Sequence, residues 1–255
     1  MPQGCMDAPH SIRIGRDGAP WVVFGHGWGR THRDFIPVAE MLAPVAQSLL
    51  IDLPGFGDTP RPENDWGTET YAAHIAHHLS HTYGIARFVW VGHSFGGRVG
   101  LRLAAAPTPG LHHLVVVAGA GVPRQRTAWE TWHGKIRSAQ YRRLKARAKT
   151  EDETIALEKR FGSADYIASR ETGLRDIFVK TVGEDQSRAA RAIEVPTTLI
   201  YGGQDTETPP DVGKRLHRLI KGSSYVECPE FGHISILDRG RHQIALAVKE
   251  ALEAE

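Results

Sequence analysis

Residues 92–96 read Gly-His-Ser-Phe-Gly, a pentapeptide with a central serine and a glycine at each end. The apolar run 87–91 precedes it, and a helix-like stretch follows it to residue 105. A serine at a sharp turn between a strand and a helix has a strained backbone, which lifts its hydroxyl clear of the sheet. The flanking residues must be small because strand and helix come close there. We therefore predict that Ser94 is a nucleophile, the alternative being a glycine-rich turn that merely contains a serine.

A nucleophilic serine needs a general base, and the base needs an acid to orient it. In proteins with this kind of turn, the catalytic residues occur along the chain in the order serine, acid, histidine, and the acid and the histidine each follow a later strand. Asp205 comes soon after the β-like run 195–201, and His233 follows the β-like run 224–228. The chain has 14 histidines, so position rather than residue type selects His233. We predict that His233 is the base and that Asp205 orients it.

Other carboxylates compete with Asp205 for this role. Glu207 and Asp211 are nearby, and each is otherwise a solvated loop charge. In a known variant the acid follows the preceding strand, but the loop 118–121 reads Ala-Gly-Ala-Gly, which favours Asp205. Asp52, at the end of the β-like run 48–52, is interpreted as a residue that fixes its loop.

Two backbone N–H groups are candidates for binding the oxyanion of an acyl-transfer intermediate. Phe95 follows the serine and starts the predicted helix, where N–H groups are free. Trp28 lies in His-Gly-Trp-Gly, directly after the apolar run 21–25, and Gly27 allows a close backbone approach. We predict that the N–H groups of Trp28 and Phe95 form an oxyanion hole, the alternative for residues 26–27 being a tight turn without a catalytic part.

The elements that must position these residues alternate along the chain. Helical stretches are predicted near 33–43, 69–83, 95–105, 210–220 and 238–253, and β-like runs near 21–25, 48–52, 87–92, 112–118, 196–202 and 223–228. Several strands are continuously apolar, which is typical of a parallel sheet with helices on both faces. Residues 121–194 contain only helical patterns, near 125–149, 151–160 and 170–182. We therefore expect an α/β core, 1–120 and 195–255, with an all-helical cap insertion at 121–194.

These segments, in this order, resemble the α/β-hydrolase superfamily. The resemblance rests on residues 26–29, 52–57, 92–97, 201–205 and 231–233 and covers nearly the whole chain outside its middle. The wording of the first two segments is similar to small carboxylesterases such as the pimeloyl-carrier-protein methyl ester esterases. Those enzymes commonly have Trp where this chain has His93, and their middle segment differs.

The resemblance implies a carboxylic ester or thioester hydrolase that works through an acyl-enzyme. An alternative is hydrolysis of a carbon–carbon bond. Related capped enzymes use an active-site arginine for this reaction, and Arg124 is a candidate for that arginine. A receptor that binds a small molecule in the hydrolase pocket is a further alternative. Dehalogenase and epoxide hydrolase chemistry are disfavoured because both need a carboxylate at the position of Ser94.

Composition is consistent with one catalytic unit of 255 residues, 41% of them hydrophobic. The net charge of +2 gives no sign of nucleic-acid binding. We find no signal peptide and no membrane-spanning run, which leads us to expect a cytoplasmic protein without a membrane partner. Cys5 and Cys228 are expected to be unpaired. The histidine pairs 77–78 and 112–113 are interpreted as surface residues, and we expect no metal and no cofactor.

Substrate choice is expected to lie in the cap. Residues 124–149 contain nine Lys or Arg and one acid, Glu130. This run is either a solvated face or a docking surface for an acidic carrier, such as acyl carrier protein or coenzyme A. Trp129 and Trp132 share a helical face, which we expect to pack onto the core or the mouth of the site. Leu174, Phe178 and Val182 are spaced four residues apart, and we expect them to face the pocket or other cap helices. The candidate substrate-binding residues are Trp28, Trp129, Trp132 and Phe178.

Overall fold

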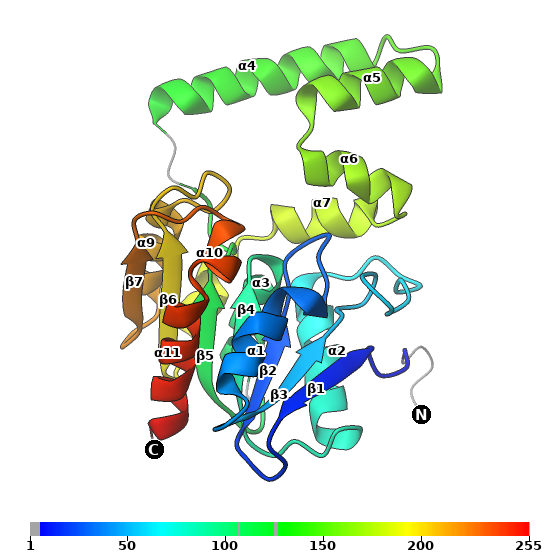
Figure 1. Cartoon of the computed structure of the whole chain (residues 1–255). Coiled ribbons are helices and arrows are strands. Elements are labelled where there is room, and N and C mark those ends of the chain that lie inside the picture. Colours follow the sequence, from blue (N-terminus) through cyan, green and yellow to red (C-terminus); the bar gives the residue numbers. More distant parts are fainter. Residues whose placement is uncertain (1–5, 107, 125–126, 255) are drawn as a thin grey trace.

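The computed structural model describes residues 6–106, 108–124 and 127–254, and one seven-stranded sheet forms its centre (Figure 1). The strand order is β1-β3-β2-β4-β5-β6-β7. All neighbouring strands are parallel except β1 and β3, which pair antiparallel at one edge. The strands are β1 (Ser11–Gly15), β2 (Trp21–Gly25), β3 (Gln47–Ile51), β4 (Phe88–His93), β5 (Leu111–Val117), β6 (Thr197–Gly202) and β7 (Ser224–Cys228).

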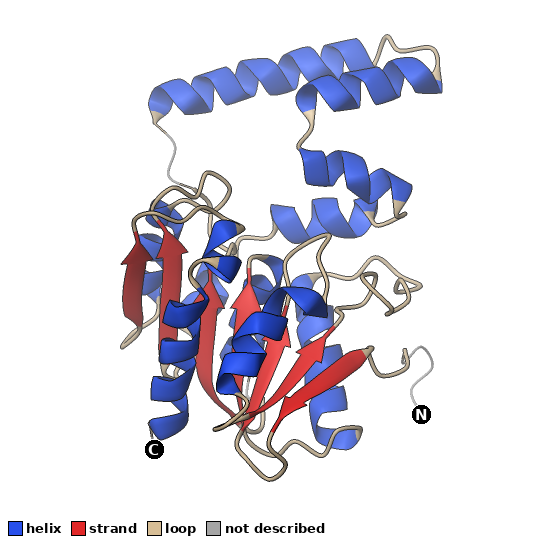
Figure 2. Cartoon of the chain, in the orientation of Figure 1, coloured by secondary structure: helices blue, strands red, loops and turns tan. Residues whose placement is uncertain are grey.

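Helices cover both faces of the sheet, as Figure 2 shows. One buried cluster packs α2 (Thr68–His81), α3 (Phe95–Ala105) and α9 (Pro210–Leu219) against one face. A second cluster packs α1 (Ile36–Leu42), α10 (Ser235–Asp238) and α11 (Arg241–Glu253) against the other. The central strand β4 is buried at every residue, which explains its unbroken apolar sequence. The predicted α/β fold is therefore confirmed.

In its described part, the segment between β5 and β6 contains five helices, α4 (Ala128–Lys145), α5 (Glu151–Phe161), α6 (Ala164–Glu171), α7 (Arg175–Gly183) and α8 (Ser187–Arg191). Helices α4 and α5 lie side by side at the top of Figure 1, and α6 and α7 connect them to the carboxyl ends of the strands. Helix α8 packs against α3 and α9 of the core. We call α4–α7 the helical insertion. Its helices are capped by threonine or serine side chains at the starts of α4, α5 and α6.

Several predicted elements were wrong in detail. The edge strand β1 was not predicted because it is only five residues long and only partly apolar. The single helix predicted at 170–182 is divided between α6 and α7, because Gly173 at φ +68° breaks it. The helix predicted at 238–253 is α11, which begins only at Arg241, after Gly240. Its predicted first residue, Asp238, is instead the last residue of α10.

The surface interpretation of the histidine pairs was also wrong for one member of each. His78 and His113 are buried, whereas His77 is exposed, because neighbouring residues on an element point in different directions. Cys228 is a buried free thiol, and Cys5 lies outside the described residues. Among the helices of the described residues, none combines the length and apolar character that a bilayer crossing requires.

Candidate active site

Ser94 occupies the turn between β4 and α3 with a strained backbone. Its φ is +47° and its ψ is −104°, and among the described residues Ala118 is the one other non-glycine residue with positive φ. The N–H of Ser94 donates to the carbonyl oxygen of Val117 in the neighbouring strand over 3.0 Å. Such strain is typical of functional turns, since surrounding contacts must hold the residue in place.

Close packing around the turn explains its glycines. A Cβ added at Gly92 would lie 2.3 Å from the carbonyl oxygen of Gly96. One added at Gly96 would lie 2.0 Å from the carbonyl oxygen of Gly25 in the adjacent strand. The indole of the buried Trp90 donates from Nε1 to the carbonyl oxygen of Gly96 over 3.0 Å. The turn is therefore fixed to the sheet on both sides.

His233 and Asp205 are in hydrogen-bond contact. Nδ1 of His233 lies 2.8 Å from Oδ2 of Asp205, and both residues are buried. Oδ1 of Asp205 accepts from the backbone N–H groups of Glu207 and Thr208 at 2.8 and 2.9 Å. Burial alone would raise the pKa of Asp205, but the hydrogen bonds from His233 and Thr208 outweigh it and keep this pKa below its ordinary value. The carboxylate is thus ionised and oriented toward the imidazole.

Thr208 joins three loops at this point and was not singled out from the sequence. Its Oγ1 lies 2.8 Å from Oδ2 of Asp205, 2.8 Å from the carbonyl oxygen of Ala118 and 3.1 Å from Nδ1 of His233. A hydroxyl has one proton and two lone pairs, so it can donate to one of these oxygens. The signal in the sequence is only a threonine three residues after the acid.

His93, the residue before the serine, contacts the loop that contains the base. Its Nε2 donates to the carbonyl oxygen of His233 over 3.0 Å, and the two rings lie 4.7 Å apart. Burial lowers the pKa of His93 to about 3, so this imidazole is neutral near pH 7. The contact brings the end of β4, and with it Ser94, next to His233.

Glu207 faces the other nitrogen of His233. Its Oε2 lies 3.4 Å from Nε2 of His233, and its side chain is 60% exposed. Because Asp205 occupies Nδ1, Glu207 is not in the position of the orienting acid. Asp211, the other alternative, lies in the first turn of α9.

The loop with Trp28 is held by a buried histidine. Nδ1 of His26 donates to the carbonyl oxygen of Gly27 over 2.7 Å, and its Nε2 accepts from the N–H of Leu53 over 2.9 Å. Burial lowers the pKa of His26 to about 4, which preserves this neutral tautomer. The indole of Trp28 lies edge-on to the ring of Phe95 at 5.2 Å. The two residues predicted as oxyanion donors are therefore neighbours.

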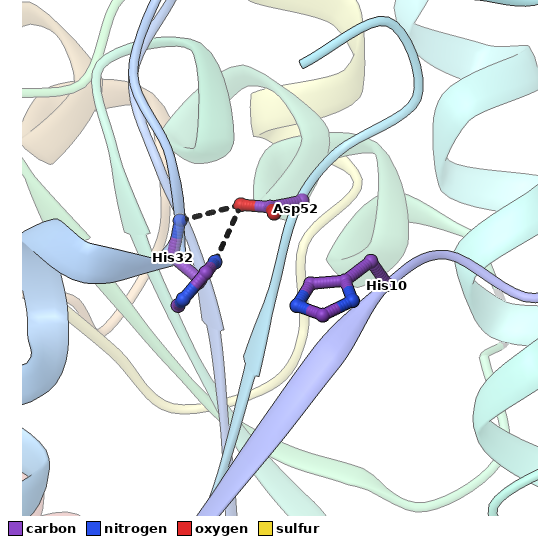
Figure 3. A group of neighbouring side chains, drawn as sticks. All are labelled: His10, His32 and Asp52. Carbon is purple, nitrogen blue, oxygen red and sulfur yellow. Dashed lines mark hydrogen bonds and ion pairs between the residues drawn. The ribbon is translucent and has the colours of Figure 1, made fainter. Parts of the chain in front are cut away.

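Asp52 ends its strand in a cluster with His32 and His10 (Figure 3). Oδ1 accepts from the backbone N–H and from Nδ1 of His32 at 2.7 and 2.9 Å, and Oδ2 accepts from the N–H of Asp58 at 3.1 Å. Burial would raise the pKa of Asp52, but these donors keep it below its ordinary value. Candidate metal-ligand atoms of the three residues lie within 4.8 Å of one another. N–H groups already occupy both oxygens of Asp52, so the contacts are those of a residue that fixes its loop.

Two cavities adjoin the site. One of about 950 Å³ lies within the helical insertion, between Tyr141 of α4, Phe161 of α5, Tyr166 of α6 and Phe178 of α7. The ring of Phe178 is 5.0 Å from that of Trp28, which in turn contacts Phe95, so one wall of this cavity touches the residues predicted as oxyanion donors. The second, of about 490 Å³, is lined by residues from the core and the insertion, among them Arg98, Arg124, Thr131, Val182, Glu207 and Thr208.

The predicted packing of Trp129 and Trp132 was wrong. The two indoles stack on each other at 5.4 Å and are 68% and 53% exposed. On the helical wheel of α4 they lie opposite Thr131 and Ser138, which line the large cavity. Their helical face was identified correctly, but the side of the helix that faces the core was not.

The repeat at 174, 178 and 182 covers two environments. Leu174 is buried next to Gly55, and Phe178 contacts Trp28. Val182 is 52% exposed and lines the smaller cavity. Of the candidate substrate-binding residues, Trp28 and Phe178 are thus the pair that the structure brings together near Ser94.

Comparison with known proteins gives one family. The model of the Alpha/beta hydrolase family matches residues 22–247. A 1-acylglycerol-3-phosphate O-acyltransferase of Arabidopsis thaliana is 23% identical over 91% of this chain and 66% of that protein. A 2-succinyl-6-hydroxy-2,4-cyclohexadiene-1-carboxylate synthase of Salmonella arizonae is 37% identical over 41% of this chain and 40% of that protein. The chain therefore spans two-fifths to about two-thirds of the length of these two relatives.

Two further similarities cover most of both proteins. A pimeloyl-[acyl-carrier protein] methyl ester esterase of Neisseria meningitidis is 26% identical over 90% of this chain and 76% of that protein. The crystal structure of an enol-lactonase of Burkholderia xenovorans superimposes with a TM-score of 0.68 and 26% identity, over 96% of each chain.

Proposed function

The chain belongs to the alpha/beta hydrolase family, and we propose that it is a serine hydrolase that cleaves carboxylic esters or thioesters through an acyl-enzyme. The relatives named as esterase and enol-lactonase support hydrolysis of an ester bond in general. The observation that carries the finer proposal is the 2.8 Å contact between Nδ1 of His233 and Asp205, in a loop whose main chain is hydrogen-bonded to His93, the residue before the serine at positive φ.

In this reaction Ser94 attacks the carbonyl carbon while Nε2 of His233 takes its proton. Asp205 accepts from Nδ1, which keeps the imidazole in the tautomer whose Nε2 is free to act as a base. The proton passes to the leaving group, and water activated by the same nitrogen then releases the acid. N–H groups of Trp28 and Phe95 stabilise the oxyanion, each worth about 3 to 4 kcal/mol.

The helical insertion is proposed to select the substrate as a cap. The bounds proposed for the cap, 121–194, also include α8, which packs against the core. The cavity of about 950 Å³ combines aromatic side chains with Lys135, Arg137 and Arg142 of α4. Aromatic walls suit an apolar acyl chain, and the cations suit an acidic carrier such as acyl carrier protein or coenzyme A. We propose such a carrier as a partner, and the enzyme is proposed to need no cofactor.

A second candidate is hydrolysis of a carbon–carbon bond with the same three residues. The observation that favours it is Arg124, which lines the smaller cavity together with Glu207 and Thr208. A cation there could stabilise an enolate leaving group. The partial similarity to the 2-succinyl-6-hydroxy-2,4-cyclohexadiene-1-carboxylate synthase is consistent with chemistry other than ester hydrolysis.

The test is a steady-state screen of p-nitrophenyl esters of increasing acyl length, with a vinylogous diketone alongside. We expect ester turnover that Ser94→Ala abolishes. Turnover of the diketone alone, again lost in Ser94→Ala, supports the second candidate. Absence of turnover with every substrate, together with a low dissociation constant for a small molecule, supports a receptor and contradicts the proposed function.

A further inference from the structure

Two carboxylates flank the imidazole of His233, one at each nitrogen. Asp205 lies 2.8 Å from Nδ1, and Oε2 of Glu207 lies 3.4 Å from Nε2. Under the proposed function, Nε2 is the atom that passes the proton of Ser94 to the leaving group. A leaving group must therefore approach within a few ångströms of Glu207.

The backbone of Glu207 is fixed by hydrogen bonds, whereas its side chain is largely exposed. Its N–H donates to Oδ1 of Asp205 over 2.8 Å, and Thr208, the next residue, is bound to the same carboxylate. The side chain of Glu207 is 60% exposed and borders the cavity of about 490 Å³. The carboxylate thus stands between Nε2 of His233 and the space in which a leaving group would lie.

Cations that line the same cavity are already engaged. Arg98 donates from Nη1 to the carbonyl oxygens of Thr181 and Glu184 at 2.8 and 3.2 Å. Arg124 is paired with Glu130 at 3.7 Å.

Carboxylates dominate the charged groups that face His233. A third carboxylate, Asp165 on α6, also lies near His233. Burial raises the pKa of Asp165, and a positive charge on His233 opposes this rise. His93, which also contacts His233, is neutral near pH 7. The surroundings of Nε2 are therefore negative.

We propose that Glu207 determines leaving-group specificity: it favours esters and thioesters whose leaving group carries a cation and disfavours those whose leaving group is anionic. This inference rests on the proposed function. A carboxylate only accepts hydrogen bonds, as does Nε2 of neutral His233, so their contact is favourable only when His233 is protonated. A cationic leaving group supplies Glu207 with a partner, which leaves the Nε2 proton for the leaving atom. An anionic leaving group brings like charges together instead.

The proton balance of the reaction is unchanged. The bond from Oγ of Ser94 to the carbonyl carbon forms, and the bond from that carbon to the leaving oxygen or sulfur breaks. The proton of Ser94 moves through Nε2 of His233 to the leaving atom. Glu207 exchanges no proton and forms no bond, so its effect is electrostatic.

Three thioacetates with different leaving groups test the proposal, with release of the thiol as the readout. The thiols are thiocholine, its uncharged carbon analogue 3,3-dimethylbutanethiol, and thioglycolate. For the wild-type protein we expect kcat/KM for the cationic ester to exceed that for the neutral one by about 3- to 10-fold, which corresponds to about 0.6 to 1.4 kcal/mol. The anionic ester should be cleaved more slowly than the neutral one.

Glu207→Gln should lower the ratio of the cationic to the neutral ester and raise that of the anionic to the neutral ester, each by about 3- to 10-fold relative to the wild-type protein, because the different acidities of the three thiols affect both proteins equally. The matched control is Glu230→Gln, which removes the same charge three residues before His233 from a side chain that forms no ion pair with any of the described residues. The control should keep the wild-type ratios. Melting temperatures of both variants separate an electrostatic effect from a folding defect, and a ratio is insensitive to a uniform loss of active protein.

The possible outcomes distinguish failure of the role proposed for Glu207 from failure of the proposed function. Ratios that are the same in Glu207→Gln as in the wild-type protein, whatever their values, overturn the role of Glu207 and leave the proposed function intact. The same holds if the protein cleaves p-nitrophenyl acetate but none of the thioacetates. Failure to cleave p-nitrophenyl acetate and all three thioacetates contradicts the proposed function as well.

Discussion

Nε2 of His93 donates a hydrogen bond to the carbonyl oxygen of His233 over 3.0 Å, so the residue before the proposed nucleophile holds the main chain of the proposed base. The bond runs between β4 and the loop after β7, which are far apart in the sequence. Gly27 belongs to the same group, because a Cβ added there would lie 2.8 Å from Nδ1 of His93. One imidazole therefore joins the loops of Ser94, His233 and Trp28.

Replacing His93 with alanine should lower kcat by about 10- to 100-fold. The loss leaves the carbonyl oxygen of His233 without its donor in a buried place, which costs about 1 to 3 kcal/mol and releases the loop of the base. The check is kcat for a p-nitrophenyl ester alongside urea unfolding.

His113→Ala is the matched control for His93. It removes a buried histidine of β5 that contacts Thr198 at 3.0 Å. This variant should lose stability but keep kcat. An equal drop of kcat in both variants would show that His93 acts only through overall stability.

Thr208→Val should lower kcat by about 10-fold or more without unfolding the protein. Valine keeps the shape of the side chain but removes the hydroxyl near Asp205, Ala118 and His233, and a hydrogen bond to a charged group contributes about 1.5 to 3 kcal/mol. Asp205→Asn should be more severe, because the amide can favour the wrong imidazole tautomer. Steady-state kinetics of the two variants provide the comparison, and near-normal kcat in Thr208→Val would contradict the role given to its hydroxyl.

The sequence was sufficient to predict the α/β fold and the places of Ser94, Asp205 and His233 in the chain. These residues could be located because each follows a β-like run, and strand ends of a parallel sheet meet at one edge. Local patterns do not specify which side chains meet across loops. The roles of Thr208, His93 and Glu207 therefore became visible only when the distances to His233 were known.

The helical insertion shows the same limit. Periodicity placed Trp129 and Trp132 on one helical face, but it does not state which face of α4 is turned toward the core. The capping box formed by Thr127 and Glu130 fixes where the helix begins and says nothing of its rotation. Gly173 broke a predicted helix because one residue at positive φ outweighs a weak apolar repeat.

Buried neutral histidines should make the protein less stable as the pH falls from about 6.5 to about 4. Burial lowers the pKa of His26 and His74 to about 4 and that of His93 to about 3, against an ordinary value of 6.5. Between pH 6.5 and the lowered pKa values, these histidines bind protons in the unfolded chain but not in the folded one. The free energy of unfolding is therefore highest above pH 6.5 and decreases below it. Urea unfolding at pH 7.5, 5.5 and 4.5 measures this decrease.

His74→Phe tests that origin at a site away from the candidate triad. Nε2 of His74 is buried and has no hydrogen-bond partner among the described residues, and its ring contacts Trp66 at 5.0 Å, so a phenyl ring suits the position. The variant should take up about one proton fewer on unfolding near pH 5. An unchanged dependence on pH would rule out His74 as a contributor.

Neutralising Arg142, Arg143 and Arg147 together should weaken turnover of a methyl ester whose acyl part is attached to an acidic carrier, so that the leaving alcohol is uncharged, while turnover of a small neutral ester stays within about 3-fold. The penalty should shrink as salt rises, because charges on an exposed surface are screened over about 8 to 10 Å near physiological ionic strength. Lys145 is left in place because it pairs with the buried Glu158 at 3.7 Å. Initial rates at several salt concentrations provide the measurement.

The control for that experiment removes Arg16, Arg87 and Arg218, three exposed arginines at the opposite end of the sheet. It should leave the rate with the carrier-linked substrate unchanged. If the variants of α4 and the control behave alike with that substrate, the basic run is a solvated face and the carrier proposal fails.

The most direct test of the proposed function is the structure and mass of the protein after reaction with a fluorophosphonate. We predict one adduct per chain on Ser94, lost in Ser94→Ala, with the phosphonyl oxygen within about 3 Å of the backbone nitrogens of both Trp28 and Phe95. Labelling of another residue, or no labelling of the folded protein, would contradict the assignment of Ser94 as the nucleophile.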